Sequence, residues 1–183
     1  MTVSRFQPDA VFEPAPAGNR VRLVTLLSTA AVGVIAVVVP ALAPLLTHHE
    51  RHRPPWPVPF VPLVALVVLA VVWLTGRIRC YRVTADELQV GLPLRTVRFP
   101  LAGLQSITPD REALRGARRI MGNDGFGAVS GRFRSRRLGP FRVYLTDGEH
   151  AVVLRWPDRC LVISPQHHSL FVDTLRRRAD LPR

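Results

Sequence analysis

The sequence predicts two membrane-spanning α-helices that form a hairpin, followed by a mainly-β domain of about seven antiparallel strands with a C-terminal helix. Residues 23–47 and 54–76 contain no charged side chain. Each run is long enough to cross a bilayer core of about 30 Å, which takes about 20 residues of helix. From Ile78 onward the sequence changes to short alternating runs separated by turn residues, which is typical of an antiparallel sandwich or barrel.

The first 76 residues divide into a tail, two spans and a loop. Residues 1–20 are rich in Pro and Ala without an apolar period, so we expect a disordered tail. The spans are expected over residues 21–47 and 58–76, joined by a polar loop over residues 48–57. An alternative is a signal peptide cleaved after Ala43, although the apolar stretch is longer than the usual 7–15 residues.

Flanking arginines indicate the orientation of this hairpin. Two arginines precede the first charge-free run (residues 23–47), two lie in the loop, and three follow the second span: Arg20, Arg22, Arg51, Arg53, Arg77, Arg79 and Arg82. Positive residues are enriched on the cytoplasmic side of membrane helices. We therefore expect a multi-pass protein of the bacterial plasma membrane with its N- and C-termini in the cytoplasm.

The strands of the β domain are expected where apolar and polar residues alternate or short apolar runs occur. They are residues 78–83, 88–90, 96–99, 104–107, 141–145, 151–154 and 160–163. Asp147-Gly148 between two such runs predicts a hairpin. Ser164 and Pro165 are typical of a helix cap and a first helical position. A helix is expected from there to residue 178, with a short tail over residues 179–183.

Three stretches of the domain resemble a known family in combination. They are Tyr81-Arg82-Val83-Thr84 with Leu88-Gln89-Val90, the stretch from Gly125-Phe126-Gly127 through Gly131-Arg132-Phe133 to Val143-Tyr144, and Val162-Ile163-Ser164-Pro165 with Phe171 and Leu175. Over residues 77–178 the chain resembles the bacterial pleckstrin-homology (PH)-like domains of small membrane proteins. The resemblance implies a fold of about seven strands closed by a C-terminal helix, and it leaves the biochemical role open.

All 25 basic residues are arginine, and the net charge is +12. A composition bias of a GC-rich genome explains the absence of lysine, but arginine also binds phosphate well through its rigid fork. Residues 77–183 hold 20 Arg against 10 Asp and Glu, so the excess lies in the β domain. Cys80 and Cys160 fit no metal or redox motif and are expected as buried, reduced thiols.

The densest basic patch is the candidate binding site. Its members are Arg118, Arg119, Arg132, Arg134, Arg136 and Arg137. On a strand, Phe133 would lie on one face and Arg132 and Arg134 on the other. Such a patch suits a solvated surface, anionic lipid headgroups or a protein partner. Nucleic acid is not expected, because no nucleic-acid-binding motif is present.

Catalytic and cofactor motifs are incomplete. The glycine-rich run over residues 122–131 lacks the Gly-Lys-Ser/Thr ending of a phosphate loop, so we expect its glycines at bends or bulges. His49 and His52 are one residue too close for the His-Glu-x-x-His zinc motif. We expect no enzyme, no cofactor and no metal site.

The sequence therefore predicts a membrane-anchored, non-enzymatic binding or scaffolding module. Its ligand would be a protein partner or anionic lipid at the inner face of the membrane, and self-association is also open. The alternative is an accessory subunit of a membrane transport or secretion complex, with the domain as docking platform. A transport path through the spans is disfavoured, because neither charge-free run, residues 23–47 or residues 54–76, contains an ionisable residue.

Overall fold

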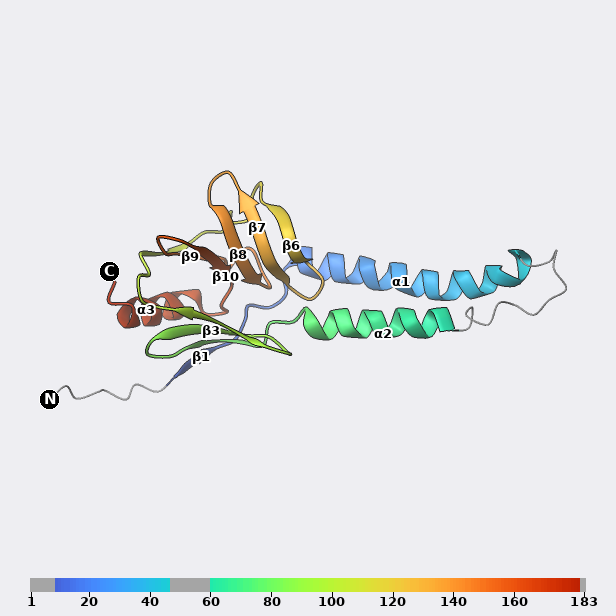
Figure 1. Ribbon diagram of the computed structural model, residues 1–183, viewed down its shortest axis with the longest axis horizontal. Coiled ribbons are helices and arrows are strands. Elements are labelled where there is room, and N and C mark those ends of the chain that lie inside the picture. The colour runs from blue at the N-terminus through green and yellow to red at the C-terminus, as the bar shows by residue number, and fades with distance from the viewer. Residues whose placement is uncertain (1–8, 47–59, 182–183) are drawn as a thin grey trace.

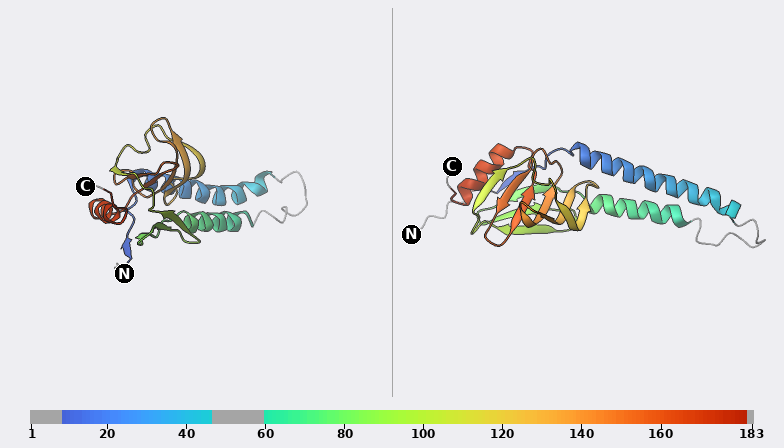
Figure 2. Two further views of the ribbon diagram at one scale, coloured as in Figure 1. Left: turned by 60° about the vertical axis from the view of Figure 1, so that its left-hand side comes forward. Right: turned by 90° about the horizontal axis from the view of Figure 1, so that it is seen from above.

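The computed structural model describes residues 9–46 and 60–181 (Figure 1). Two helices, α1 (Asn19–Leu46) and α2 (Phe60–Thr75), lie side by side and extend from one end of a β domain. Figure 2 shows the same arrangement from two further directions.

The two helices differ in how well they match a membrane span. Within α1, residues 19–42 are long and apolar enough to cross a membrane, with a mean hydropathy of 2.3. α2 has 16 residues and a length of about 24 Å, and its apolar stretch Pro62–Val71 is shorter than a span. Among the described residues there is thus one candidate span, and the second span stays a prediction. The predicted loop over residues 48–57 lies outside the described residues.

The prediction of a disordered tail over residues 1–20 is wrong for its second half. Strand β1 (Ala10–Phe12) pairs antiparallel with β2 (Cys80–Val83). The Phe12 side chain is buried and meets Phe171 edge-on, with ring centroids 5.1 Å apart. The Ala15 N–H donates to the Ser164 carbonyl at 2.8 Å. Burial of the Phe12 side chain in the core offsets the entropy lost when this segment becomes ordered. The segment is therefore ordered although its composition is typical of disorder.

The domain has two sheets. The four-stranded sheet has the order β1-β2-β3-β4, and the six-stranded sheet has the order β5-β9-β10-β8-β7-β6. The remaining strands are β3 (Glu87–Gly91), β4 (Thr96–Pro100), β5 (Ser106–Pro109), β6 (Arg118–Asp124), β7 (Val129–Ser135), β8 (Gly139–Leu145), β9 (Val152–Arg155) and β10 (Cys160–Ile163). The alternating runs correctly predicted seven of these strands, and β1, β6 and β7 come in addition.

The core lies between the two sheets and is closed by helix α3 (His168–Arg178). From α3, Phe171, Val172 and Leu175 are buried, whereas the neighbouring Leu170 is exposed. A second cluster covers the other face of the six-stranded sheet and includes Val21 from the first turn of α1. The start of α1 is therefore packed as part of the domain.

The predicted hairpin at Asp147-Gly148 is absent. Strands β8 and β9 do not pair with each other, because β10 lies between them, antiparallel to β9 and parallel to β8. All four residues of β10 are buried. A strand without a polar face fits best in the middle of a sheet, where both faces are covered, and this preference overrides the local turn signal.

The predicted helix start at Ser164 and Pro165 is also wrong, since α3 begins at His168. The Ser164 side chain is fully buried, and its Oγ accepts the Thr146 N–H at 2.8 Å. Pro165 forms a bridge with Pro14. The hydroxyl that was expected to cap the helix instead satisfies the backbone at the end of β8.

Candidate functional site

Three neighbouring strands, β6, β7 and β8, form a basic ribbon at one edge of the six-stranded sheet. On β7, Phe133 is buried while Arg132 and Arg134 are exposed, which confirms the predicted alternation. Arg136 lies in the turn that follows β7. The strand pattern therefore presents one charged face along the ribbon.

Arginines lie directly opposite each other across this ribbon. Arg118 pairs in register with Arg134, and Arg132 with Arg142. Side chains at such positions start about 5 Å apart, and like charges there destabilise a sheet. Within the described part of the chain, no carboxylate lies within 4.0 Å of any of the four guanidinium groups. We call Arg118, Arg132, Arg134 and Arg142 the ribbon arginines.

Arg142 is held in place by an aromatic ring. Its guanidinium carbon lies 5.9 Å from the centroid of the Phe99 ring, within the range of a cation–π contact. Trp156 stacks against the same ring, with centroids 6.3 Å apart. This contact links Arg142 of the six-stranded sheet to the aromatic side chain of Phe99 on β4.

A hollow of about 1120 Å³ adjoins the ribbon at the β7–β8 turn. Its basic lining residues are Arg115, Arg118, Arg134, Arg136 and Arg137. Two of them are neutralised locally, because Arg115 pairs with Glu112 at 2.9 Å and Arg137 pairs with Asp110. The free positive charge of the hollow therefore comes from Arg118, Arg134 and Arg136.

The structure brings together four of the six arginines predicted from the sequence. Arg118, Arg132, Arg134 and Arg136 gather as described above. Arg119 lies opposite Phe133 and thus on the other face of the ribbon, where it donates to the Gly122 carbonyl at 3.3 Å. Arg137 is occupied by Asp110.

Sequence reasoning missed Arg142. Its only local signal is the alternation Phe141-Arg142-Val143, which marks it as exposed on a strand. That it faces Arg132 follows from the pairing of β7 with β8.

Glycines allow the ribbon strands to approach closely. Gly122 and Gly131 pair across β6 and β7, and their φ angles are 124° and 131°. A Cβ on Gly122 would lie 2.1 Å from the Ser130 carbonyl oxygen. Gly122 and Gly131 therefore lie on closely paired strands, not at a bulge, whereas Gly125 and Gly127 lie in the bend between β6 and β7, as expected for glycines at bends. A bulge between Arg119 and Met121 interrupts the β6–β7 ladder.

The ribbon is attached to α1. Arg20 forms an ion pair with Asp124 at the end of β6, 2.8 Å long. Thr25 Oγ1 accepts the Gly127 N–H at 3.0 Å, so the β6–β7 turn rests on the first turns of the helix. In Figures 1 and 2, β6 is the strand of the six-stranded sheet that lies nearest to the helices.

A second polar region is buried where the N-terminal segment crosses the domain. Tyr81 is fully buried, its hydroxyl donates to the Tyr144 carbonyl at 2.8 Å, and it accepts the Ser164 N–H at 3.3 Å. Thr146 Oγ1 donates to the Ala15 carbonyl at 2.5 Å. Burial is the main cause that raises the pKa of the Tyr81 phenol, which therefore stays protonated. We call Tyr81, Ser164, Thr146 and Ala15 the buried seam.

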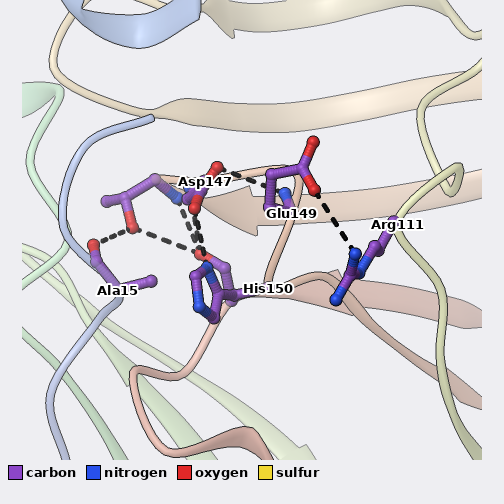
Figure 3. Close-up of polar contacts among 7 residues, drawn as sticks. Ala15, Arg111, Asp147, Glu149 and His150 are labelled. Atoms are coloured by element: carbon purple, nitrogen blue, oxygen red, sulfur yellow. Dashed lines mark hydrogen bonds and ion pairs between the residues drawn. The ribbon is translucent and has the colours of Figure 1, made fainter. Parts of the chain in front are cut away.

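Beside this seam, Figure 3 shows an ion pair of Arg111 with Glu149 and a hydrogen-bond contact of His150 with Asp147. His150 Nδ1 lies 2.7 Å from the Asp147 carboxylate, which resembles half of a catalytic triad. No hydroxyl or thiol among the described residues is hydrogen-bonded to this imidazole. The pair therefore lacks the nucleophile that such chemistry requires.

Both cysteines carry free thiols at the first residue of a strand, Cys80 in β2 and Cys160 in β10. Cys160 is buried, and this burial raises the pKa of its thiol. Cys80 is only half-buried. Over residues 9–46 and 60–181, no three His, Cys, Asp or Glu side chains are grouped for a metal ion. His49 and His52 lie outside this part of the chain.

The two-sheet architecture with a C-terminal helix fits the PH-like fold. A family model of the bacterial PH domain matches residues 79–179, which is more than half of the chain. The chain therefore belongs to the bacterial PH domain family, as the resemblance indicated. No curated protein matches the sequence. PH-like domains are in general binding modules without enzymatic activity, which is consistent with a site built from arginines.

Proposed function

We propose that this chain is a membrane-anchored, non-enzymatic binding module whose ribbon arginines contact anionic lipid headgroups. Two pairs of arginines in directly opposed register positions, Arg118 with Arg134 and Arg132 with Arg142, carry the proposal, and among the described residues no carboxylate forms an ion pair with them. A phosphate placed between two guanidinium groups replaces their repulsion by two charge-assisted hydrogen bonds.

The position of the ribbon favours a membrane surface over a soluble ligand. Strand β6 lies next to the helices (Figure 1), and neighbouring strands are about 4.8 Å apart. The headgroup layer is about 5–7 Å thick on each side of the hydrocarbon core. Arginines on β6 and β7 are therefore closest to this layer, and Arg142 on β8 is one strand farther away.

We further propose that α1 and α2 both span the bacterial plasma membrane, with the domain and both termini in the cytoplasm. The apolar surface of α1 and the arginines at the domain end of both helices support this orientation. Reporter fusions after Arg183 and within the predicted loop at His52 test it. An external C-terminus, or release of the chain by alkaline carbonate, would contradict this part of the proposal.

Hydrogen exchange of the full chain in lipid nanodiscs tests the headgroup contact. We expect slower exchange of β6 and β7 in nanodiscs that contain phosphatidylglycerol than in pure phosphatidylcholine nanodiscs. The difference should shrink when the salt is raised, because the screening length falls from about 10 Å at 0.1 M to about 3 Å at 1 M.

Two triple variants with the same charge change make this test specific. Arg118→Gln, Arg132→Gln and Arg134→Gln together should abolish the lipid-dependent protection. The matched control is Arg82→Gln, Arg155→Gln and Arg177→Gln, three exposed arginines outside the ribbon. An equal loss of lipid-dependent protection in both variants would show that the protection depends only on the net charge of the chain. Unchanged protection in the ribbon variant would overturn the headgroup contact and turn attention to an acidic protein partner.

A further inference from the structure

The surface of the β domain exposes five large apolar side chains among the described residues. They are Val11, Leu94, Ile120, Met121 and Leu170. Three of them are the most exposed, with Leu94 at 82%, Met121 at 69% and Ile120 at 61% of their full accessible surface. None of these three belongs to either packed core cluster, so the fold itself does not account for them.

Leu94 lies in the β3–β4 turn, close to the end of α2. The Arg79 N–H donates to the Gly91 carbonyl at 2.8 Å, which places the end of β3 beside the chain that emerges from α2. The turn is closed by the Leu92 N–H, which donates to the Arg95 carbonyl at 2.9 Å. Leu92 packs against the core, whereas Leu94 is exposed, and so are Arg95 beside it in the turn and Arg79, whose backbone is bonded to the end of β3.

Ile120 and Met121 lie on β6, the edge strand nearest to the helices (Figures 1 and 2). The bulge between Arg119 and Met121 interrupts regular pairing at this point. Both apolar side chains are therefore presented on a strand edge, directly after Arg118 and Arg119. Leu170 offers a contrast, because α3 lies at the end of the domain away from the helices (Figure 1).

The contact between α1 and the β6–β7 turn determines how far Ile120 and Met121 lie from the apolar part of the helix. The β6–β7 turn contacts α1 at Thr25, and a Cβ on Gly125 would lie 3.2 Å from the Val24 side chain. Large exposed apolar side chains of α1 begin at Leu23. The apolar surface of the helix thus starts at the level of the turn, so the proposed anchoring would bring the edge of the bilayer to this edge of the domain.

We propose that Leu94 and the Ile120–Met121 pair insert into the interfacial layer of the bilayer that holds α1, at two points of the same domain surface. Apolar side chains flanked by cations suit this layer, because the side chains bury among acyl chains while the guanidinium groups remain among phosphates. The inference rests on the proposed membrane anchoring and adds to it an apolar contact that is independent of lipid charge.

Lipid quenching of a fluorophore at defined positions tests the insertion. Leu94→Cys, Met121→Cys and, as matched control, Leu170→Cys are each labelled with an environment-sensitive nitrobenzoxadiazole group in the full chain. The unsubstituted chain measures any labelling of Cys80 and Cys160. In nanodiscs that contain a doxyl-labelled phosphatidylcholine, we expect quenching at positions 94 and 121 that is several-fold stronger than at position 170. Equal quenching at all three positions would overturn the proposal.

The same preparation separates this inference from the headgroup contact. Quenching at positions 94 and 121 should persist in purely zwitterionic nanodiscs and at high salt, where the charge-dependent protection of β6 and β7 is lost. If the protection depends on phosphatidylglycerol but no position is quenched, the headgroup contact stands and the insertion is wrong. In unlabelled chains, Leu94→Ser with Met121→Ser should speed exchange of β6 in zwitterionic nanodiscs, and Leu170→Ser should leave it unchanged.

Discussion

The buried seam and the ribbon arginines use polar groups in opposite ways. In the seam, the Tyr81 hydroxyl and the Ser164 and Thr146 side chains each have a hydrogen-bond partner within the fold. In the ribbon, four exposed arginines face each other with no carboxylate among the described residues to neutralise them. The first arrangement contributes to stability, and the second lowers stability unless something outside the chain binds it.

In a domain without an arrangement of catalytic residues, charged groups that the fold leaves unpaired indicate where a ligand can bind. Satisfied polar groups in a protein interior belong to the folding of the chain. Repulsive pairs that the fold leaves unresolved are retained at a cost, and a ligand of opposite charge removes that cost. The following variants test the contrast, and each stability measurement uses urea unfolding of the full chain in mild detergent, because an uncharged denaturant does not screen the repulsion between arginines.

The largest effect is expected in the core beside the seam. Phe171 is fully buried against Phe12 and Tyr81. Phe171→Ala should lower the free energy of unfolding by about 3–5 kcal/mol, because it removes a large side chain and leaves a cavity. The neighbouring Leu170→Ala is the control, and its effect should stay within about 0.5 kcal/mol because the side chain is exposed.

The next effect concerns the backbone of the ribbon. Gly122→Ala places a Cβ against the Ser130 carbonyl at a residue with a φ of 124°. The strain should cost about 1–3 kcal/mol and should speed hydrogen exchange in β6 and β7. Gly148→Ala, at a glycine with no heavy atom within 4 Å of the added Cβ, should change neither quantity. Equal effects of both substitutions would mean that close strand approach is unimportant.

An effect of similar size is expected from the seam hydroxyl. Tyr81→Phe leaves the Ser164 N–H without its hydroxyl acceptor and should cost about 1–3 kcal/mol.

The same variant tests a dependence on pH. The pKa of Tyr81 is raised in the folded protein, whereas an unfolded tyrosine titrates near about 10. The stability linked to this proton is therefore present below about pH 10 and is lost as the pH rises above it. Unfolding of the parent chain should become easier above that pH, and Tyr81→Phe should lose less stability over the same interval. Parallel pH profiles would show that Tyr81 does not contribute.

The smallest effect has the opposite sign. Arg132→Gln removes a like-charge contact with Arg142 and should raise the free energy of unfolding by about 0.2–1 kcal/mol in the absence of lipid. The gain should shrink at high salt, because screening already weakens the repulsion. Arg82→Gln, on an exposed position of β2, is the matched control. A loss of stability in Arg132→Gln would show that the ribbon is part of the folding core.

Local patterns were sufficient where side chains alternate or run apolar without interruption. They correctly predicted seven strands, a C-terminal helix and the family. They also correctly placed Phe133 on one face of its strand and Arg132 and Arg134 on the other face. They failed where a distant partner decides the outcome. Phe12 orders a segment that its composition marks as disordered, Ser164 binds Thr146 instead of capping α3, and β10 separates β8 from β9.

Two apolar runs, an excess of arginine in the β domain and the strand periodicity can be recognised without a structure, because each of these is a property of neighbouring residues. Which arginines lie opposite each other depends on the fold. Arg142 joined the ribbon, Arg119 turned to its other face, and Arg137 was neutralised by Asp110. The physical reason is that repulsion between two charges depends on their distance in space, which strand order and register determine and which local sequence does not encode.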